Sequence, residues 1–192
     1  MSSGIALAMP ASWRSLDLDP TTRAENNRRV VEEAIPSGLG ATEARKLMLG
    51  LLRDATDSAV TGRAAVAALY CSAADGIPLG ASLVATVLEA TTAPADQLPP
   101  DAQALADSLQ TTIAAGTGER RDLPAGPGVR VQRQQTGTDV GSPVPVQTVQ
   151  WYVLHPKGDR MAILSFSTPN VALAEPFGEV FDAIAWSLQW TS

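Results

Sequence analysis

The sequence has few of the residues that most enzyme and metal sites need. Its 192 residues include one cysteine, Cys71, and one histidine, His155. A single cysteine excludes an intramolecular disulfide and any cluster of thiolate metal ligands. A mechanism that depends on histidine would use His155 alone. We therefore expect no metal, no cofactor and, by default, a reducing cytoplasmic location.

Cations and long apolar runs are scarce as well. The formal net charge is −6, and only Lys46 and Lys157 accompany the arginines among 14 cations. Generic binding to nucleic acid needs a basic surface that displaces counterions, so we expect no nucleic-acid partner. No stretch reaches the ~18 uncharged apolar residues of a membrane span. The apolar start, residues 4–9, lacks a cationic flank and meets Pro10, so we expect no signal peptide.

The remaining composition is typical of one folded domain. Hydrophobic residues make up 45% of the chain and charged residues 18%. These fractions are typical of globular proteins rather than disordered ones. A chain of this length buries roughly 70% of the surface that its unfolded form exposes, so it needs no disulfide or bound metal to stabilise the fold. We predict a single domain over residues 1–192.

The first third of the chain predicts strand, then two helices. Residues 4–9 alternate with strand period, and residues 12–18 are expected to add a short strand. Asp19 is the expected N-cap of a helix with Pro20 in its first turn. A second helix is expected over about 41–58, and the two helices read as an insertion at about 20–58. The predicted buried stripe of the second helix consists of Ala44, Leu47, Met48, Leu51, Leu52 and Ala55.

The rest of the chain predicts mostly strands. Residues 64–90 are two runs, apolar on both faces, around Asp-Gly, which indicates a central hairpin covered above and below. A linker and a short helix from Asp101, with Leu105, Leu109 and Ile113 on one stripe, should follow. Next come a strand at 126–135 and a Gly/Pro loop at 136–147, followed by a hairpin at 149–166. The loop is either a simple hairpin connection, which is the commoner case, or a mobile segment open to a partner. A final helix should place Phe181 and Ile184 against the sheet.

This order of elements predicts an α+β fold. Short hairpin links favour antiparallel strands, and doubly apolar strands need cover on both faces. We therefore expect a three-layer α/β/α sandwich with a mainly antiparallel central sheet.

Two quoted stretches also resemble a known group. These are "MPASWRSLDL" near the start and "VQWYVLHPKGDRMAILSFSTPN…FGEVFDAIAWSLQW" at the end. They resemble the Mog1/PsbP-like superfamily, which includes small bacterial proteins of the DcrB and LpqN kind. The resemblance implies an antiparallel sheet with helices on both sides and an accessory, non-enzymatic role. The preference for Arg over Lys and the many alanines look actinobacterial.

The candidate reactive residues have ordinary structural explanations. His155 could act as a general base, but it adjoins a Pro-Lys-Gly-Asp turn, so we expect a solvent-facing turn residue. Cys71 could be a nucleophile, but it lies in an apolar run, where free cysteine behaves as a small hydrophobe. No nucleophile-elbow motif is present, and residues 80–82, "GAS", lie within an expected strand.

The glycine-rich and charged motifs are equally weak. Residues 38–40 and 116–118 each read G-x-G, but both lack the third glycine and the preceding strand of a phosphate site. Glu32 and Glu33 are adjacent and point to different sides of a helix, whereas Arg28 and Glu32 should form a surface pair. The four tryptophans should mostly pack in the core, with Trp186 and Trp190 one helical turn apart.

These observations favour a non-catalytic accessory or protein-interaction module with a protein partner. The alternative is a carrier of a small apolar ligand, held between the sheet and a helix layer. An enzyme ranks third, because no catalytic, cofactor-binding or metal-ligating residue stands out.

Overall fold

The architecture is that of a computed structural model. It describes residues 4–35, 41–74, 77–89, 117–139 and 142–191. The predicted linker and the helix from Asp101 lie outside these residues, as do the Asp-Gly turn at 75–76 and the G-x-G at 38–40. No helix in the described ranges is long and apolar enough to cross a membrane.

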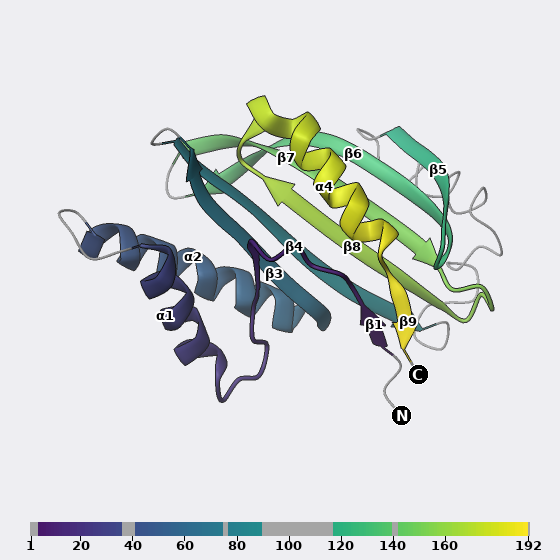
Figure 1. The fold of residues 1–192 in the computed structure, drawn as a ribbon, viewed down its shortest axis with the longest axis horizontal. Helices are drawn as coiled ribbons and strands as arrows, with labels where there is room; N and C mark the ends of the chain where they lie inside the picture. Colours follow the sequence, from purple (N-terminus) through teal and green to yellow (C-terminus); the bar gives the residue numbers. More distant parts are fainter. Residues whose placement is uncertain (1–3, 36–40, 75–76, 90–116, 140–141, 192) are drawn as a thin grey trace.

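A seven-stranded sheet forms the body of the protein, and every neighbouring pair in it is antiparallel (Figure 1). Its spatial order is β2-β3-β4-β8-β7-β6-β5. The strands are β2 (Trp13–Ser15), β3 (Ala64–Ala74), β4 (Ile77–Glu89), β5 (Thr117–Leu123), β6 (Gly126–Asp139), β7 (Ser142–Leu154) and β8 (Arg160–Thr168). A separate two-stranded sheet pairs β1 (Gly4–Ala6) with β9 (Gln189–Thr191) near the two termini.

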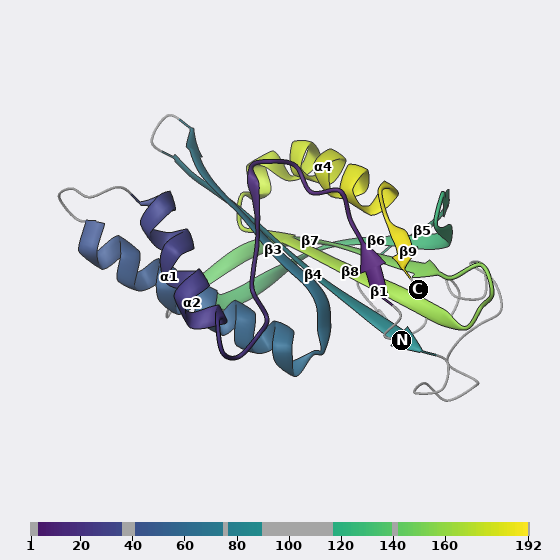
Figure 2. The ribbon, with the colours of Figure 1, turned by 60° about the horizontal axis from the view of Figure 1, so that its bottom comes forward.

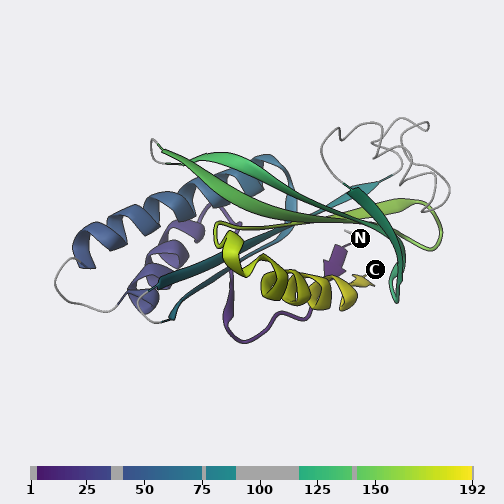
Figure 3. The ribbon, with the colours of Figure 1, turned by 90° about the horizontal axis from the view of Figure 1, so that it is seen from above.

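Helices lie on both faces of the large sheet, as Figures 2 and 3 show. They are α1 (Arg23–Ala34), α2 (Ala41–Thr61) and α4 (Ala174–Trp186), the last preceded by a 3-10 turn, η1 (Val171–Leu173). Helix α4 packs on β7 and β8, whereas α2 packs on β3. The predicted antiparallel sheet is confirmed. The predicted three-layer sandwich is not, because the described helices are few and each covers only part of a face.

The β3–β4 hairpin is covered on both faces, as its doubly apolar sequence predicts. Ala68 and Leu83 belong to the core under α4, whereas Ala67 packs with Val30 and Leu52 of α1 and α2. Successive strand residues point to opposite faces, so neighbours in the sequence join different cores. Leu52 is the member of the predicted α2 stripe whose side chain the structure describes, and it is buried.

Helix α1 begins later than predicted. Its N-cap is Thr22 rather than Asp19. The Asp19 carboxylate accepts hydrogen bonds from the Thr21 backbone N–H (2.8 Å) and hydroxyl (2.6 Å), and these bonds lower its pKa. Aspartate readily closes such a local turn, and here the turn precedes the helix instead of capping it.

The loop predicted at 136–147 is wrong. Strand β6 continues to Asp139 and β7 starts at Ser142, with Thr136 opposite Pro145 and Thr138 opposite Pro143. Two prolines spaced by two remove N–H groups from the same edge of a strand. Strand β7 pairs with β8 only from Gln147 onward. Before that residue, the β8 side of β7 has no neighbouring strand among the described residues, so the two missing proline N–H groups break no ladder hydrogen bond there.

Two strands were missed because they carry little apolar sequence. Edge strand β5 reads "TGERRDL" and pairs with β6, although four of its side chains are charged. Strand β9 follows α4 directly, so Trp190 lies in a strand and not one helical turn from Trp186. The predicted placement of α4 is confirmed, since Phe181 and Ile184 are buried with Leu164 and Phe166 of β8.

Candidate functional site

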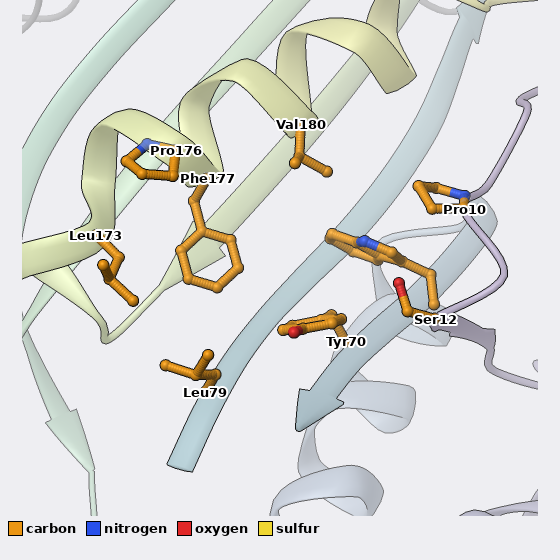
Figure 4. A pocket seen from close by; sticks show the side chains of 9 residues that line it. Pro10, Ser12, Tyr70, Leu79, Leu173, Pro176, Phe177 and Val180 are labelled. Carbon is orange, nitrogen blue, oxygen red and sulfur yellow. The ribbon is translucent and has the colours of Figure 1, made fainter. Parts of the chain in front are cut away.

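An apolar groove lies between α4 and the β2–β3 edge of the sheet (Figure 4). Its volume is about 300 Å³. Three separate parts of the chain contribute to it: the N-terminal segment, the β3–β4 hairpin, and the start of α4 with the turn before it. The lining residues are Pro10, Ser12, Trp13, Tyr70, Leu79, Leu173, Pro176, Phe177 and Val180.

Aromatic rings form the wall and floor of the apolar groove. The Tyr70 ring centroid lies 6.1 Å from that of Trp13 and 5.8 Å from that of Phe177. Beneath them, the buried Phe181 ring packs edge-on against Trp13 at 6.2 Å. Tilted and edge-on contacts at these distances are favourable and hold the rings in fixed orientations. The groove is therefore a preformed surface.

The rim of the apolar groove exposes aliphatic side chains. Leu173 is 38% exposed and Val180 is 37% exposed. The only side-chain hydroxyls in the lining belong to Ser12 and Tyr70. No lining residue carries a charge, so the groove offers apolar contact area and has no group for acid–base chemistry at neutral pH.

A partly buried polar cluster fixes α4 over the sheet. One oxygen of the Asp182 carboxylate accepts from Arg130 Nε at 2.8 Å and from Trp151 Nε1 at 3.0 Å. Trp151 is buried and lies on β7, and Arg130 lies on β6. This shared oxygen ties the helix to two strands, and it thereby sets the position of the groove wall that α4 provides.

His155 is not the solvent-facing residue that its turn suggested. Its side chain is 12% exposed, with Nδ1 2.6 Å from Asp159 Oδ1. The ring meets Trp190 edge-on at 5.0 Å, and Nε2 lies 3.2 Å from Arg160 Nη2. The prediction failed because β9 brings Trp190 onto the turn, a long-range contact that local sequence does not encode.

Both ring nitrogens of His155 are already engaged. Nδ1 lies 2.6 Å from the Asp159 carboxylate and 3.3 Å from the Lys157 backbone nitrogen, and Nε2 lies beside the Arg160 guanidinium. Arg160 also lies over the Trp190 ring at 5.3 Å. The cluster joins the turn of the β7–β8 hairpin to Trp190 of β9.

Cys71 lies on β3 and is partly buried. Burial raises the pKa of its thiol, an effect that nearby Arg14 partly offsets. The thiol form therefore dominates at neutral pH, which agrees with the predicted small hydrophobe. Residues 80–82 lie within β4, also as predicted.

The charged pairs differ from the sequence prediction. Arg28 pairs with Glu25 rather than Glu32, and Glu33 pairs with Arg14 of β2 at 2.6 Å. Within the described ranges, no three His, Cys, Asp or Glu side chains gather in a way that could hold a metal ion.

Sequence reasoning missed the apolar groove. Trp13 was assigned to the core, where it is indeed buried, and Tyr70 and Phe177 come from elements far apart in the chain. The spacing of apolar residues in the final helix puts Leu173 and Val180 on the same stripe as Phe181, yet both are exposed. The available signal was an apolar stripe on α4 too wide for the face that packs on β7 and β8.

Comparisons with known proteins show a distant structural likeness and no match in sequence. No protein-family model matches the chain, and no curated protein matches it. Among solved structures, LpqN of Mycobacterium tuberculosis, described as involved in cell envelope biogenesis, aligns over 100% of this chain and 85% of its own. The identity is 13% and the TM-score is 0.47, a likeness too distant to carry a function to this chain.

Proposed function

We propose that this chain is a non-catalytic protein-interaction module whose apolar groove receives apolar side chains of a protein partner. The observation that carries the proposal is a preformed groove, open to the surface and walled by Trp13, Tyr70 and Phe177. Tryptophan and tyrosine in packed hollows are the residues that contribute most to protein–protein binding. Exposed apolar patches on a protein surface often mark sites of protein–protein interaction.

The shape of the groove favours a protein partner over a small ligand. Small-molecule sites bury most of the ligand and place several polar groups to orient it. This groove opens to the surface between Leu173 and Val180, and its side-chain hydroxyls are those of Ser12 and Tyr70. An amphipathic segment of another protein, with apolar residues spaced along one face, would fill such an open groove.

A carrier of a small apolar ligand is the second candidate. The groove lies between the sheet and α4, and its volume of about 300 Å³ is at the lower end of the range for ligand pockets. A carrier would retain its ligand through purification, whereas an interaction module would retain a protein.

The test compares two glutamate substitutions on α4. Val180→Glu places a charge on the rim of the groove, and Ala183→Glu places the same charge on an exposed position outside it. In pull-downs from native extract, a stoichiometric partner should be captured by the wild type and Ala183→Glu and lost with Val180→Glu. Equal capture by all three proteins would contradict the docking site.

Native mass spectrometry and solvent extraction of the same samples separate the two candidates. A lipid or metabolite that co-purifies with the wild type and not with Val180→Glu would replace the protein partner with the carrier function.

The proposal has two further parts, which concern the superfamily of the chain and its location in the cell. Membership in the Mog1/PsbP-like superfamily is supported by the antiparallel sheet with helices on both faces, and an experimental structure compared with that group tests it. A cytoplasmic location is supported by the single cysteine, and cell fractionation tests it.

A further inference from the structure

The sheet face opposite α4 has a second hollow, of about 240 Å³, and seven of its nine lining residues have polar side chains. We call it the polar hollow. Apolar clusters flank it on the same face: Val84 packs with the α1–α2 core on one side, and Met161 packs with Val129 and Val131 on the other. The lining residues are Ser82, Val84, Arg133, Gln135, Thr148, Gln150, Ser165, Phe166 and Ser167.

Strand register gathers the polar side chains into two rows. Ser167 lies opposite Ser82 on one side and Thr148 on the other. Ser165 lies opposite Gln150 in the next row. Directly paired residues share a face of the sheet, so these groups converge from β4, β8 and β7. Four strands therefore supply one continuous polar surface, with Arg133 of β6 at its side.

The polar groups are oriented by hydrogen bonds to one another. The Ser82 and Ser167 hydroxyl oxygens are 2.7 Å apart, and Gln150 Nε2 donates to the Ser165 hydroxyl at 3.2 Å. Tyr152 donates its hydroxyl proton to Gln150 Oε1 at 3.3 Å. A hydroxyl has one donor and two acceptor sites. Each serine therefore keeps capacity for a ligand while its direction is fixed.

Arg133 supplies the charge in the polar hollow. Its side chain is partly buried, and its guanidinium donates to Gln150 Oε1. Among the described residues, no carboxylate forms an ion pair with it, although seven other pairs occur. A partly buried cation with only neutral partners favours an anion, and the guanidinium fork matches a carboxylate in two parallel bonds.

From this placement we propose that the polar hollow binds a small carboxylate that also carries several hydroxyl groups. Its carboxylate would pair with Arg133, and its hydroxyls would bond to the rows formed by Ser82, Ser165 and Ser167. The hollow has room for about eight water molecules at ~30 Å³ each, the space that a short polyhydroxy chain displaces. The site is separate from the apolar groove, which lies on the other face.

Three six-carbon probes test the proposal on the full chain by amide NMR titration. Gluconate has the carboxylate and the hydroxyls, sorbitol has the hydroxyls alone, and hexanoate has the carboxylate alone. Gluconate should give saturable shifts at the amides of Gln150, Ser165 and Ser167. Sorbitol and hexanoate should each bind at least about tenfold more weakly, because each lacks one half of the recognition.

Matched arginine variants test the role of the charge. Arg133→Gln should weaken gluconate binding at least about tenfold. Arg120→Gln removes the same charge from an exposed position on β5 and should change binding less than about twofold. Ser167→Ala should weaken gluconate several-fold and leave hexanoate unchanged, so it serves if Arg133→Gln does not fold. The proposal is overturned if gluconate fails to saturate, if either single-feature probe binds as tightly, or if Arg120→Gln matches Arg133→Gln.

Discussion

Phe181 is the side chain whose removal should weaken the fold most directly. It is fully buried, stacks on Phe166 with ring centroids 4.8 Å apart, and meets Trp13 edge-on. Phe181→Ala removes the ring and leaves a cavity between α4 and β8. Large-to-small changes of this kind cost about 3–5 kcal/mol of unfolding free energy, from lost transfer energy and the cavity together.

The loss is measured as a change in thermal midpoint. In a chain of 150–250 residues, about 1 kcal/mol moves the midpoint by ~2–4 °C, so Phe181→Ala should lower it by roughly 6–20 °C. Val180→Ala is the control, since this neighbour on α4 is exposed and should cost less than ~1 kcal/mol. Urea unfolding should show a lower midpoint with an unchanged slope.

The reasoning has a clear point of failure. A Phe181→Ala shift below ~2 °C, or one equal to that of Val180→Ala, would show that α4 is not docked through this face. The same variant should weaken capture of the partner proposed for the apolar groove, well below its melting temperature. That effect follows because Phe177, in the groove wall, rests on Phe181 at 5.8 Å.

Three further substitutions or treatments have defined outcomes. Asp182→Ala leaves Arg130 and Trp151 Nε1 without their shared acceptor. It should lower the free energy of unfolding in urea by about 2–3 kcal/mol, less than the loss of a fully buried ion pair. A decrease under ~0.5 kcal/mol would contradict the role of Asp182 in fixing α4. His155→Ala should cost about 1–2 kcal/mol rather than nothing, because the ring is held by Asp159 and Trp190; an unchanged melting curve would return it to an ordinary turn residue. Burial raises the pKa of Cys71, so iodoacetamide at pH 8 should modify the folded chain more slowly than the urea-unfolded chain, and equal rates would contradict the burial. The contribution of the neutral Cys71 thiol to the free energy of unfolding is fully present below its ordinary pKa of 9.0. That contribution is lost as the pH rises through the higher pKa that the thiol has in the folded chain.

The spacing of apolar residues was sufficient to predict the buried face where a single helix or hairpin is covered by its neighbours. The spacing of Phe181 and Ile184 predicted the buried side of α4, and the doubly apolar runs predicted a covered β3–β4 hairpin. Both predictions rest on patterns within a single element. They required no knowledge of which strand lies beside which.

The spacing of apolar residues was insufficient where the structure depends on which strand pairs with which. Strand β5 and the ends of β6 and β7 are polar or rich in Gly and Pro, yet ladder hydrogen bonds to a neighbouring strand order them. The burial of His155 depends on Trp190, 35 residues away in the sequence. Both candidate sites share this property, since each combines side chains from at least three elements.

The apolar groove exists because α4 covers only part of its face of the sheet. Helix α4 packs on β7 and β8, so the β3 side of that face needs other cover. The N-terminal segment crosses there, and Ile5, Leu7 and Met9 pack against the same core (Figure 2). The groove is the part that neither the segment nor the helix fills. Pairing of Ile5 with Trp190 in the β1–β9 sheet joins both ends of the chain, so this pairing limits how far the two walls can separate.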